Sequence, residues 1–235
     1  MIASSRIAVF EDHEEQRDRY ADAVRAMGME PFRVDTPPPL SEIAAFLHDN
    51  RITGVISDHR LKEKHYSPYL GAELLETCYG LRIGAVLLTS YTHRDANTTL
   101  RLYRRWLPCV FDPDKLSNPA LEIKAALERA DAEARKGLVP AQREPFRAVM
   151  TVTRTELQGN LQMVKVLIGQ WRPNTEVAFP FEMIPVEMRH HVKPNHLLIA
   201  QVNLDAENPD DLYFEKFELP DADAYRESQA LPDHP

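Results

Sequence analysis

The chain contains 235 residues, which is enough for one large domain or two small ones. Its formal net charge of −8 argues against a large nucleic-acid interface, because phosphate binding depends on clustered lysine and arginine. No apolar run approaches the roughly 18 residues of a membrane span, and the first residues lack the features of a signal peptide. Cys78 and Cys109 are too few for a disulfide framework. We therefore expect a cytoplasmic protein with buried thiols and no membrane partner.

Residues 1–138 alternate short apolar runs with longer amphipathic stretches. The runs have the length of strands, and the stretches have the apolar spacing of helices. The predicted strands are Arg6–Phe10, Glu30–Val34, Gly54–Asp58, Gly84–Thr89 and Cys109–Phe111, and the predicted helices are His13–Met27, Ser41–Asn50, Leu70–Tyr79, Arg94–Arg105 and Ser117–Gly137. Five strand-then-helix repeats predict an α/β fold, namely a doubly wound five-stranded parallel sheet with helices on both faces.

The character of the sequence changes after Gly137. Pro140 and Pro145 mark a linker at residues 139–146, and residues 147–220 are rich in proline and β-forming residues. The predicted strands of this part are Phe146–Arg154, Leu161–Ile168, Val177–Phe181, His196–Asn203 and Leu212–Glu218. We expect a small, mainly-β barrel or sandwich here, followed by an acidic flexible tail at residues 221–235.

Acidic and hydroxyl side chains follow three of the predicted parallel strands. Glu11 and Asp12 follow the first strand, Asp58 ends the third and Thr89 ends the fourth. Ligands bind beyond the carboxyl ends of strands in such a sheet, so three carboxylates should converge at one edge. Like charges at close range are costly without a cation, and oxygen ligands suit Mg²⁺. The carbonyl oxygen of Arg60 is a further candidate ligand, and the Thr89 hydroxyl is placed to reach a phosphoryl oxygen.

In their order and spacing, these residues resemble the receiver domain of two-component response regulators. The family pattern has an acidic pair after the first strand, an aspartate after the third, Thr or Ser after the fourth and Lys-Pro after the fifth. The matching runs are Phe10-Glu11-Asp12, Ile56-Ser57-Asp58-His59-Arg60-Leu61, Leu87-Leu88-Thr89-Ser90 and Leu70-Gly71-Ala72-Glu73-Leu74-Leu75. The resemblance covers a little over half of the chain and implies a flavodoxin-like fold of the chemotaxis-receiver type.

The resemblance also implies a specific chemistry. Asp58 would accept a phosphoryl group from a histidine kinase or phosphotransfer protein, and Thr89 would bind a phosphoryl oxygen. Glu11, Asp12, Asp58 and the Arg60 carbonyl would hold Mg²⁺. Trp106 lies where the family carries its switch aromatic. Such a protein is not an enzyme beyond autocatalytic phosphoryl transfer and dephosphorylation of its own aspartate.

One departure from the family pattern affects this interpretation. The run Cys109-Val110-Phe111 stands where the family has Lys-Pro-Phe, so the lysine that pairs with the acyl phosphate is absent. A neutral thiol cannot replace an ammonium group in binding a phosphoryl group. Lys115, Lys62 and Lys64 are nearby in sequence and are alternative sources of positive charge.

The sequence leaves several functions open. The first is an atypical phosphorelay response regulator that signals through protein contacts of its β-rich domain. The second is a pseudo-receiver that takes no phosphate and serves as an adaptor or dimerisation scaffold. In a third, the β-rich domain itself is catalytic or binds a small ligand. The acids could instead merely cap helices.

Two other groups of side chains could have either a purely structural role or a function. Arg94, Arg101, Arg104 and Arg105 on the fourth predicted helix make either a solvated face or a basic surface for a homodimer or another partner. His190, His191 and His196 lie close together in sequence, but adjacent residues on a strand point to opposite faces. We therefore expect no metal site at these histidines.

Overall fold

The computed structural model describes residues 5–62, 65–90 and 95–220, and its contacts divide the chain into two compact units. The first unit contains the described residues of 5–90 together with 106–140. The second contains Asp95–Arg105 and the described residues of 141–220. The first unit is therefore built from two separate stretches of the chain.

The first unit is built on a parallel sheet whose strand order is β2-β1-β3-β4-β5. The strands are β1 (Arg6–Phe10), β2 (Glu30–Arg33), β3 (Gly54–Asp58), β4 (Gly84–Leu88) and β5 (Val110–Phe111). This is the order of flavodoxin-like folds, in which ligands bind where the strand order reverses, between β1 and β3. The predicted doubly wound five-stranded sheet is confirmed.

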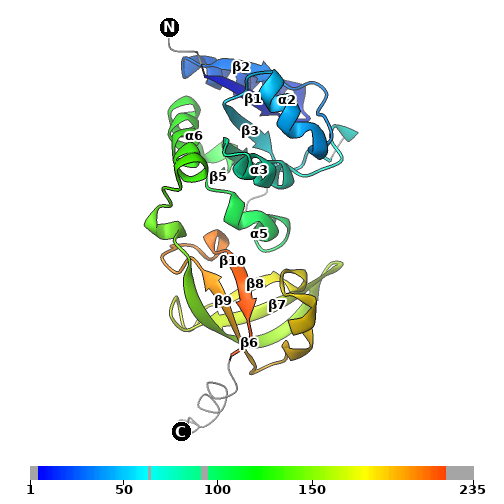
Figure 1. Ribbon diagram of the computed structural model, residues 1–235, viewed down its shortest axis with the longest axis vertical. Helices are drawn as coiled ribbons and strands as arrows, with labels where there is room; N and C mark the ends of the chain where they lie inside the picture. Colours follow the sequence, from blue (N-terminus) through cyan, green and yellow to red (C-terminus); the bar gives the residue numbers. More distant parts are fainter. Residues whose placement is uncertain (1–4, 63–64, 91–94, 221–235) are drawn as a thin grey trace. The chain divides into compact units, whose positions relative to one another are not determined.

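Helices cover both faces of this sheet, because side chains along a strand alternate between its faces. The α-helices in the described part of the first unit are α1 (Glu14–Ala26), α2 (Ile43–Asp49), α3 (Gly71–Gly80) and α6 (Pro119–Lys136). Val9 of β1 belongs to a buried cluster with Tyr20 of α1 and Ile123 of α6. The next residue, Phe10, packs edge-on against Phe46 of α2, with ring centroids 6.2 Å apart. In Figure 1, α6 and α2 accordingly lie on opposite sides of the sheet.

The ends of α6 have clear local causes. The Asn118 side chain accepts a hydrogen bond from the Leu121 N–H at 3.3 Å, which caps the first turn. Pro119 follows at the first helical position, where no main-chain donor is needed. Gly137 ends the helix with φ of +66°, a left-handed conformation that glycine adopts at little cost.

The second unit contains an antiparallel sheet in the order β10-β9-β6-β7-β8. Its strands are β6 (Phe146–Gln158), β7 (Leu161–Ile168), β8 (Glu176–Pro180), β9 (Leu197–Val202) and β10 (Phe214–Glu218). All five strands predicted from the sequence are present, although β6 extends further than expected. The β6–β7 hairpin turns at Gly159, whose φ of +62° suits a two-residue loop.

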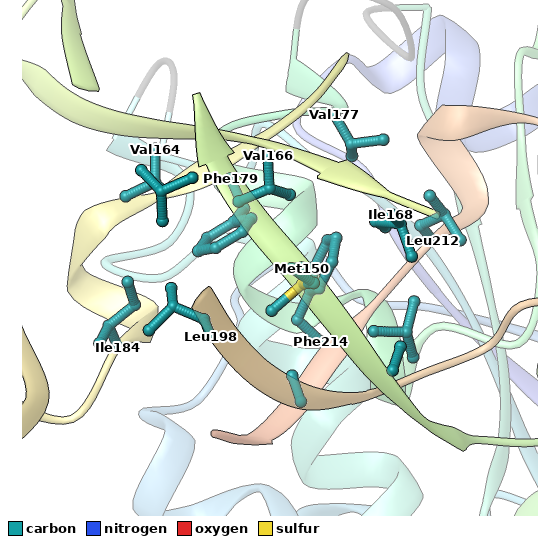
Figure 2. Close-up of a cluster of buried hydrophobic side chains, with 14 of the residues drawn as sticks. Met150, Val164, Val166, Ile168, Val177, Phe179, Ile184, Leu198, Leu212 and Phe214 are labelled. Atoms are coloured by element: carbon teal, nitrogen blue, oxygen red, sulfur yellow. The ribbon is translucent and has the colours of Figure 1, made fainter. Parts of the chain in front are cut away.

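The core of the second unit lies on one face of this sheet. Ala148 and Met150 of β6 are fully buried, whereas Val149 between them is 41% exposed. Figure 2 shows the inward side chains converging from several strands. Phe179 of β8 contacts Phe214 of β10, with ring centroids 4.7 Å apart. Because β8 and β10 are the two edges of the sheet, the sheet curls around its core like a small open barrel rather than forming two stacked sheets.

The segment Asp95–Arg105 packs within the second unit, which differs from the continuous first domain of residues 1–138 that the sequence predicted. It contains the short helix α5 (Thr99–Tyr103) and enters a 3₁₀ turn at Arg104–Trp106. The expected long helix over residues 94–105 is thus much shorter. The segment is tied in place by Arg143, whose Nη2 donates to the carbonyl oxygen of Arg105 at 2.6 Å.

Two arginines of this segment are buried in the second unit. Arg101 is 1% exposed and donates to the carbonyl oxygens of Leu212 and, at 2.8 Å, Pro209. Arg104 is 8% exposed, and its Nη2 lies 2.6 Å from Oδ1 of Asp211. The prediction of a solvated or partner-binding basic face is therefore wrong for these two residues, because carbonyl and carboxylate oxygens of the same unit bind their guanidinium groups.

Some sequence predictions fall on residues whose structure is not described, namely the tail 221–235, Lys64 and Arg94. Cys78 and Cys109 are both buried and form no disulfide, as expected. No helix in the described part of the chain is long and apolar enough to cross a membrane.

We predict that Arg101→Met destabilises the second unit by about 2–4 kcal/mol, because buried carbonyl oxygens lose a charged donor. Urea unfolding should be followed in a Trp106→Phe background, where Trp171 is the one remaining tryptophan and reports on the second unit. The matched control is Arg147→Met, which removes an exposed ion pair with Glu218 at 3.1 Å and should cost less than about 1 kcal/mol. Equal losses from both variants would contradict the prediction.

Candidate functional site

Three carboxylates meet at the carboxyl edge of the parallel sheet. Because β1 and β3 are parallel neighbours, Glu11 and Asp12, just after β1, lie beside Asp58 at the end of β3. One ligand atom from each of the three lies within 4.8 Å of the others. The predicted convergence is therefore present, at the point where the strand order reverses.

These carboxylates border a pocket of about 320 Å³, and Arg60 lines it as well. The residues around the pocket come from the end of β1, from α1, from the ends of β3 and β4 and from the turn after β5. They are Glu11, Asp12, His13, Glu15, Gln16, Arg19, Tyr20, Asp58, Arg60, Ser90, Pro113 and Asp114. The site thus combines carboxylates, two arginines and one exposed hydroxyl.

Several of these lining residues were not predicted from the sequence. Glu15, Gln16, Arg19 and Tyr20 follow the helical spacing of one face of α1, the helix that begins just after Asp12. That spacing was available in the sequence as a signal. Asp114 offered no comparable signal, because its position depends on where β5 ends.

The close approach of the carboxylates changes the protonation of Glu11. Burial, and after it the negative charge of Asp58, raises the pKa of Glu11 from 4.5 to about 8. The His13 N–H donates to Oε1 of Glu11 at 3.1 Å and opposes this shift. Without a cation, Glu11 therefore keeps its proton near neutral pH.

Asp12 contributes a buried oxygen that has no donor. Its side chain is 3% exposed, and Oδ2 accepts no hydrogen bond from any described residue. A buried anionic oxygen without a partner is unfavourable. The oxygen-only set of Glu11, Asp12 and Asp58 matches what Mg²⁺ prefers, so the residues present fit the predicted ion.

The carboxylate of Asp58 is oriented by the main chain. The Arg60 N–H donates to Oδ2 of Asp58 at 2.7 Å. Helix α3 begins directly behind it, where the Gly71 N–H donates to the carbonyl oxygen of His59 at 2.8 Å. A Cβ at Gly71 would lie 1.8 Å from the carbonyl oxygen of Asp58, so only glycine permits this close approach.

The predicted hydroxyl and its neighbour occupy different environments. Thr89 is 1% exposed, its N–H donates to the carbonyl oxygen of Phe111 at 2.8 Å, and it does not border the pocket. Ser90, the next residue, is exposed and lines the pocket. Of these two neighbouring residues, Ser90 rather than Thr89 therefore borders the pocket.

The structure corrects the position assigned to Cys109. Strand β5 pairs with β4 through Val110 and Phe111, so Asp112 is the first residue beyond the strand and Pro113 follows it. Asp112-Pro113, rather than Cys109-Val110, therefore stands where the family has Lys-Pro. Cys109 precedes the strand, is buried, and its thiol donates to the carbonyl oxygen of Ala126. The error arose because β5 has only two residues, and so short a strand has no sequence pattern from which its last residue could be predicted.

Asp112 and the nearby lysines are bound to local partners. Oδ1 of Asp112 accepts the Asp114 N–H at 3.2 Å and caps a short 3₁₀ turn. Nζ of Lys115 lies 3.2 Å from the other oxygen of Asp112. Lys62 pairs with Glu73 at 3.1 Å. Neither lysine lines the pocket.

Two other predicted positions lie away from the pocket lining. Trp106 lies in a 3₁₀ turn before β5, and its ring packs against Tyr79 of α3 with centroids 5.3 Å apart. His190 and His191 lie in a 3₁₀ helix rather than a strand, and their rings are 3.9 Å apart. Among the described residues, no metal-binding group includes a histidine. The expectation that His190 and His191 lie on a strand was wrong.

No protein-family model matches the chain, and no curated protein matches it in sequence. Its N-terminal part is similar to several solved structures. A response regulator receiver domain protein from Clostridium thermocellum is 16% identical with a TM-score of 0.42, and the match covers 57% of this chain and 99% of that one. The signal receiver domain of an HD domain-containing protein from Pseudomonas fluorescens Pf-5 is 13% identical with a TM-score of 0.44, covering 58% and 93%. NtrX from Brucella abortus is 17% identical with a TM-score of 0.44, covering 60% and 30%.

We predict that Gly71→Ala destabilises the first unit by at least about 2 kcal/mol, because the added methyl group would overlap the carbonyl oxygen of Asp58. Gly80→Ala is the matched control on the same helix, since a Cβ there meets nothing within 4 Å. It should be neutral or stabilising by up to about 1 kcal/mol. Urea unfolding in a Trp171→Phe background, read by Trp106, measures both. Similar effects of the two substitutions would refute this account of α3.

We predict that the stability of the cation-free protein falls between about pH 5 and 9 because of Glu11. The folded state holds the Glu11 proton up to its pKa of about 8, whereas the unfolded chain releases it near 4.5, so the stabilisation is lost as pH rises. Relative to wild type, Glu11→Gln should therefore gain about 1–3 kcal/mol on going from pH 5 to pH 9. Unfolding with EDTA at both pH values measures this gain, with the exposed Glu15→Gln as control. A gain that does not depend on pH would contradict the assignment.

Proposed function

We propose that the first unit is a receiver of a phosphorelay and that Asp58 accepts the phosphoryl group. The observation that carries this proposal is the convergence of Glu11, Asp12 and Asp58 on one pocket, with the Arg60 N–H bound to the Asp58 carboxylate. Three carboxylates from the ends of two strands lie so close together that the pKa of Glu11 is raised. Helix capping alone does not explain this arrangement. The chain would then belong to a signalling system rather than to metabolism.

The chemistry at Asp58 follows from its surroundings. A carboxylate oxygen of Asp58 attacks the phosphorus of a phosphohistidine on a kinase or phosphotransfer protein. The phosphorus–nitrogen bond breaks as the new oxygen–phosphorus bond forms, and the released imidazole takes up a proton from solvent. The main-chain bond from Arg60 holds the attacking group in one orientation. Hydrolysis of the acyl phosphate by water would restore Asp58.

A divalent cation is expected to accompany this reaction. Glu11, Asp12, Asp58 and the carbonyl oxygen of Arg60 would hold Mg²⁺, which supplies charge neutralisation for the entering phosphoryl oxygens when bound. Glu11 must release its proton to serve as a ligand, so cation binding should strengthen as pH rises toward 8. We assign the hydroxyl contact to Thr89, which would have to turn toward the pocket, with Ser90 already at its border.

A second function is favoured by the turn after β5. There Asp112 stands in the place of lysine and pairs with Lys115, so the turn offers no ammonium group to a phosphoryl oxygen. A pseudo-receiver that takes no phosphate and acts as an adaptor or homodimeric scaffold would have this composition. The two functions differ in whether Asp58 binds a phosphoryl mimic.

The second unit is proposed to bind another protein. It leaves large apolar side chains at the surface, among them Phe146, Val149 and Leu157 of β6 and Val186 of a 3₁₀ helix. The net charge of the chain is −8, which favours a protein partner over nucleic acid. Tight, salt-sensitive binding to DNA would contradict this part of the proposal.

We predict that beryllofluoride, a mimic of the acyl phosphate, binds saturably in the presence of millimolar Mg²⁺ and changes the fluorescence of Trp106. The measurement should use a Trp171→Phe background, so that Trp106 is the only emitter. Asp58→Asn should abolish the change, because the amide cannot form the anionic complex. Asp49→Asn, which alters an exposed carboxylate on α2, is the control and should leave it intact.

The two outcomes separate the two functions. A saturable change that disappears with Asp58→Asn supports a working phosphoacceptor. No change in fluorescence or in amide NMR shifts at excess beryllofluoride would overturn it and support the pseudo-receiver instead.

A further inference from the structure

The pocket around Asp58 has an excess of negative charge. Five carboxylates line it, namely Glu11, Asp12, Glu15, Asp58 and Asp114. A phosphoryl group on Asp58 would add further negative charge, with oxygens that accept strong hydrogen bonds from cations. A divalent ion offsets part of this charge, and a side-chain cation is needed to bind the oxygens that the ion does not reach.

No described lysine supplies that cation. Lys115 is bound to Asp112 at 3.2 Å with 63% of its side chain exposed, and Lys62 is bound to Glu73 at 3.1 Å. Neither residue lines the pocket. The cations that do line it are the arginines Arg19 and Arg60.

Arg19 has an unusual position among the arginines near α1. Arg17 pairs with Asp35 at 3.3 Å, and Arg33 pairs with Asp18 at 2.7 Å. Arg19 makes no ion pair with any carboxylate in the described part of the chain, although it lines a pocket rich in them. Its charge is therefore not already committed to a protein carboxylate.

Arg19 is an exposed residue, and it contacts a neighbour on α1 that also lines the pocket. Its Nη1 donates to Oε1 of Gln16 at 3.3 Å. Nε2 of Gln16 in turn donates to the hydroxyl of Tyr20 at 2.9 Å, and Tyr20 is 6% exposed. A buried tyrosine thus anchors the glutamine that contacts the arginine, and all three line the pocket.

We infer that Arg19 is the cation that binds the phosphoryl group on Asp58, in place of the lysine that receivers carry after the fifth strand. This inference rests on the proposed function of Asp58. The guanidinium group is planar, always charged and able to donate two parallel hydrogen bonds to phosphoryl oxygens. Arg60 also lines the pocket and is the other candidate, so the test below includes it.

The test compares beryllofluoride affinity with Mg²⁺ affinity in the full-length Trp171→Phe protein. Arg19→Gln should weaken beryllofluoride binding about 5- to 10-fold, while Arg19→Lys, which keeps the charge but not the paired N–H donors, should lose less. Binding of Mg²⁺ alone should be unchanged or tighter in Arg19→Gln, because a positive charge near the carboxylates is removed. A merely structural loss would weaken both ligands. Lys115→Gln is the matched control and should leave beryllofluoride affinity unchanged.

Each result has a defined meaning. If wild type binds beryllofluoride and Asp58→Asn does not, but Arg19→Gln binds as wild type does, the role of Arg19 is overturned and the phosphoacceptor stands. If Arg60→Gln weakens beryllofluoride binding and Arg19→Gln does not, the role of Arg19 is also overturned, and Arg60 is the cation that binds the phosphoryl group. If wild type itself fails to bind, the proposed function fails, and the role of Arg19 fails with it.

Discussion

Electrostatic repulsion among Glu11, Asp12 and Asp58 is the main constraint on the structure at the carboxyl edge of the parallel sheet. One ligand atom from each lies within 4.8 Å of the others, and one oxygen of Asp12 is buried without a donor. The protein alone tolerates this arrangement by keeping Glu11 protonated. The main chain holds Asp58 in place. The Arg60 N–H donates to its carboxylate, and Gly71 allows the start of α3 to pack against its carbonyl oxygen. The repulsion between these carboxylates is unfavourable, and a bound cation would reduce it.

Much of this site could be predicted from the sequence because its residues follow regular elements. Buried apolar strands such as Ile7–Phe10 identify a parallel sheet, and the carboxyl ends of neighbouring parallel strands must meet. Glu11, Asp12 and Asp58 could therefore be brought together without coordinates. The strands of the second unit were equally predictable, because inward residues such as Met150 and Val152 alternate with exposed ones.

Other features depend on contacts that no local pattern contains. The end of the two-residue β5 is set by its pairing with β4, so the assignment of Cys109 rather than Asp112 to the lysine position could not be checked in the sequence. Arg101 has the pattern of a surface arginine, yet its acceptors lie 108 and 111 residues away. Arg19 is a partial case: helical spacing places it on one face of α1, but the acidic pocket that this face borders is defined only in the structure.

The interleaving of the two units restricts how this protein can have been assembled and how it can change. Many multidomain proteins can exchange one domain for another through a single recombination at a linker. Here a single crossover between Pro140 and Ala141 would deliver a new second unit but leave Asp95–Arg105 behind, with the cations of Arg101 and Arg104 separated from the oxygens that bind them. The two units are therefore expected to be inherited together, and this segment should vary in step with the loop around Pro209–Asp211 rather than with the sheet that precedes it.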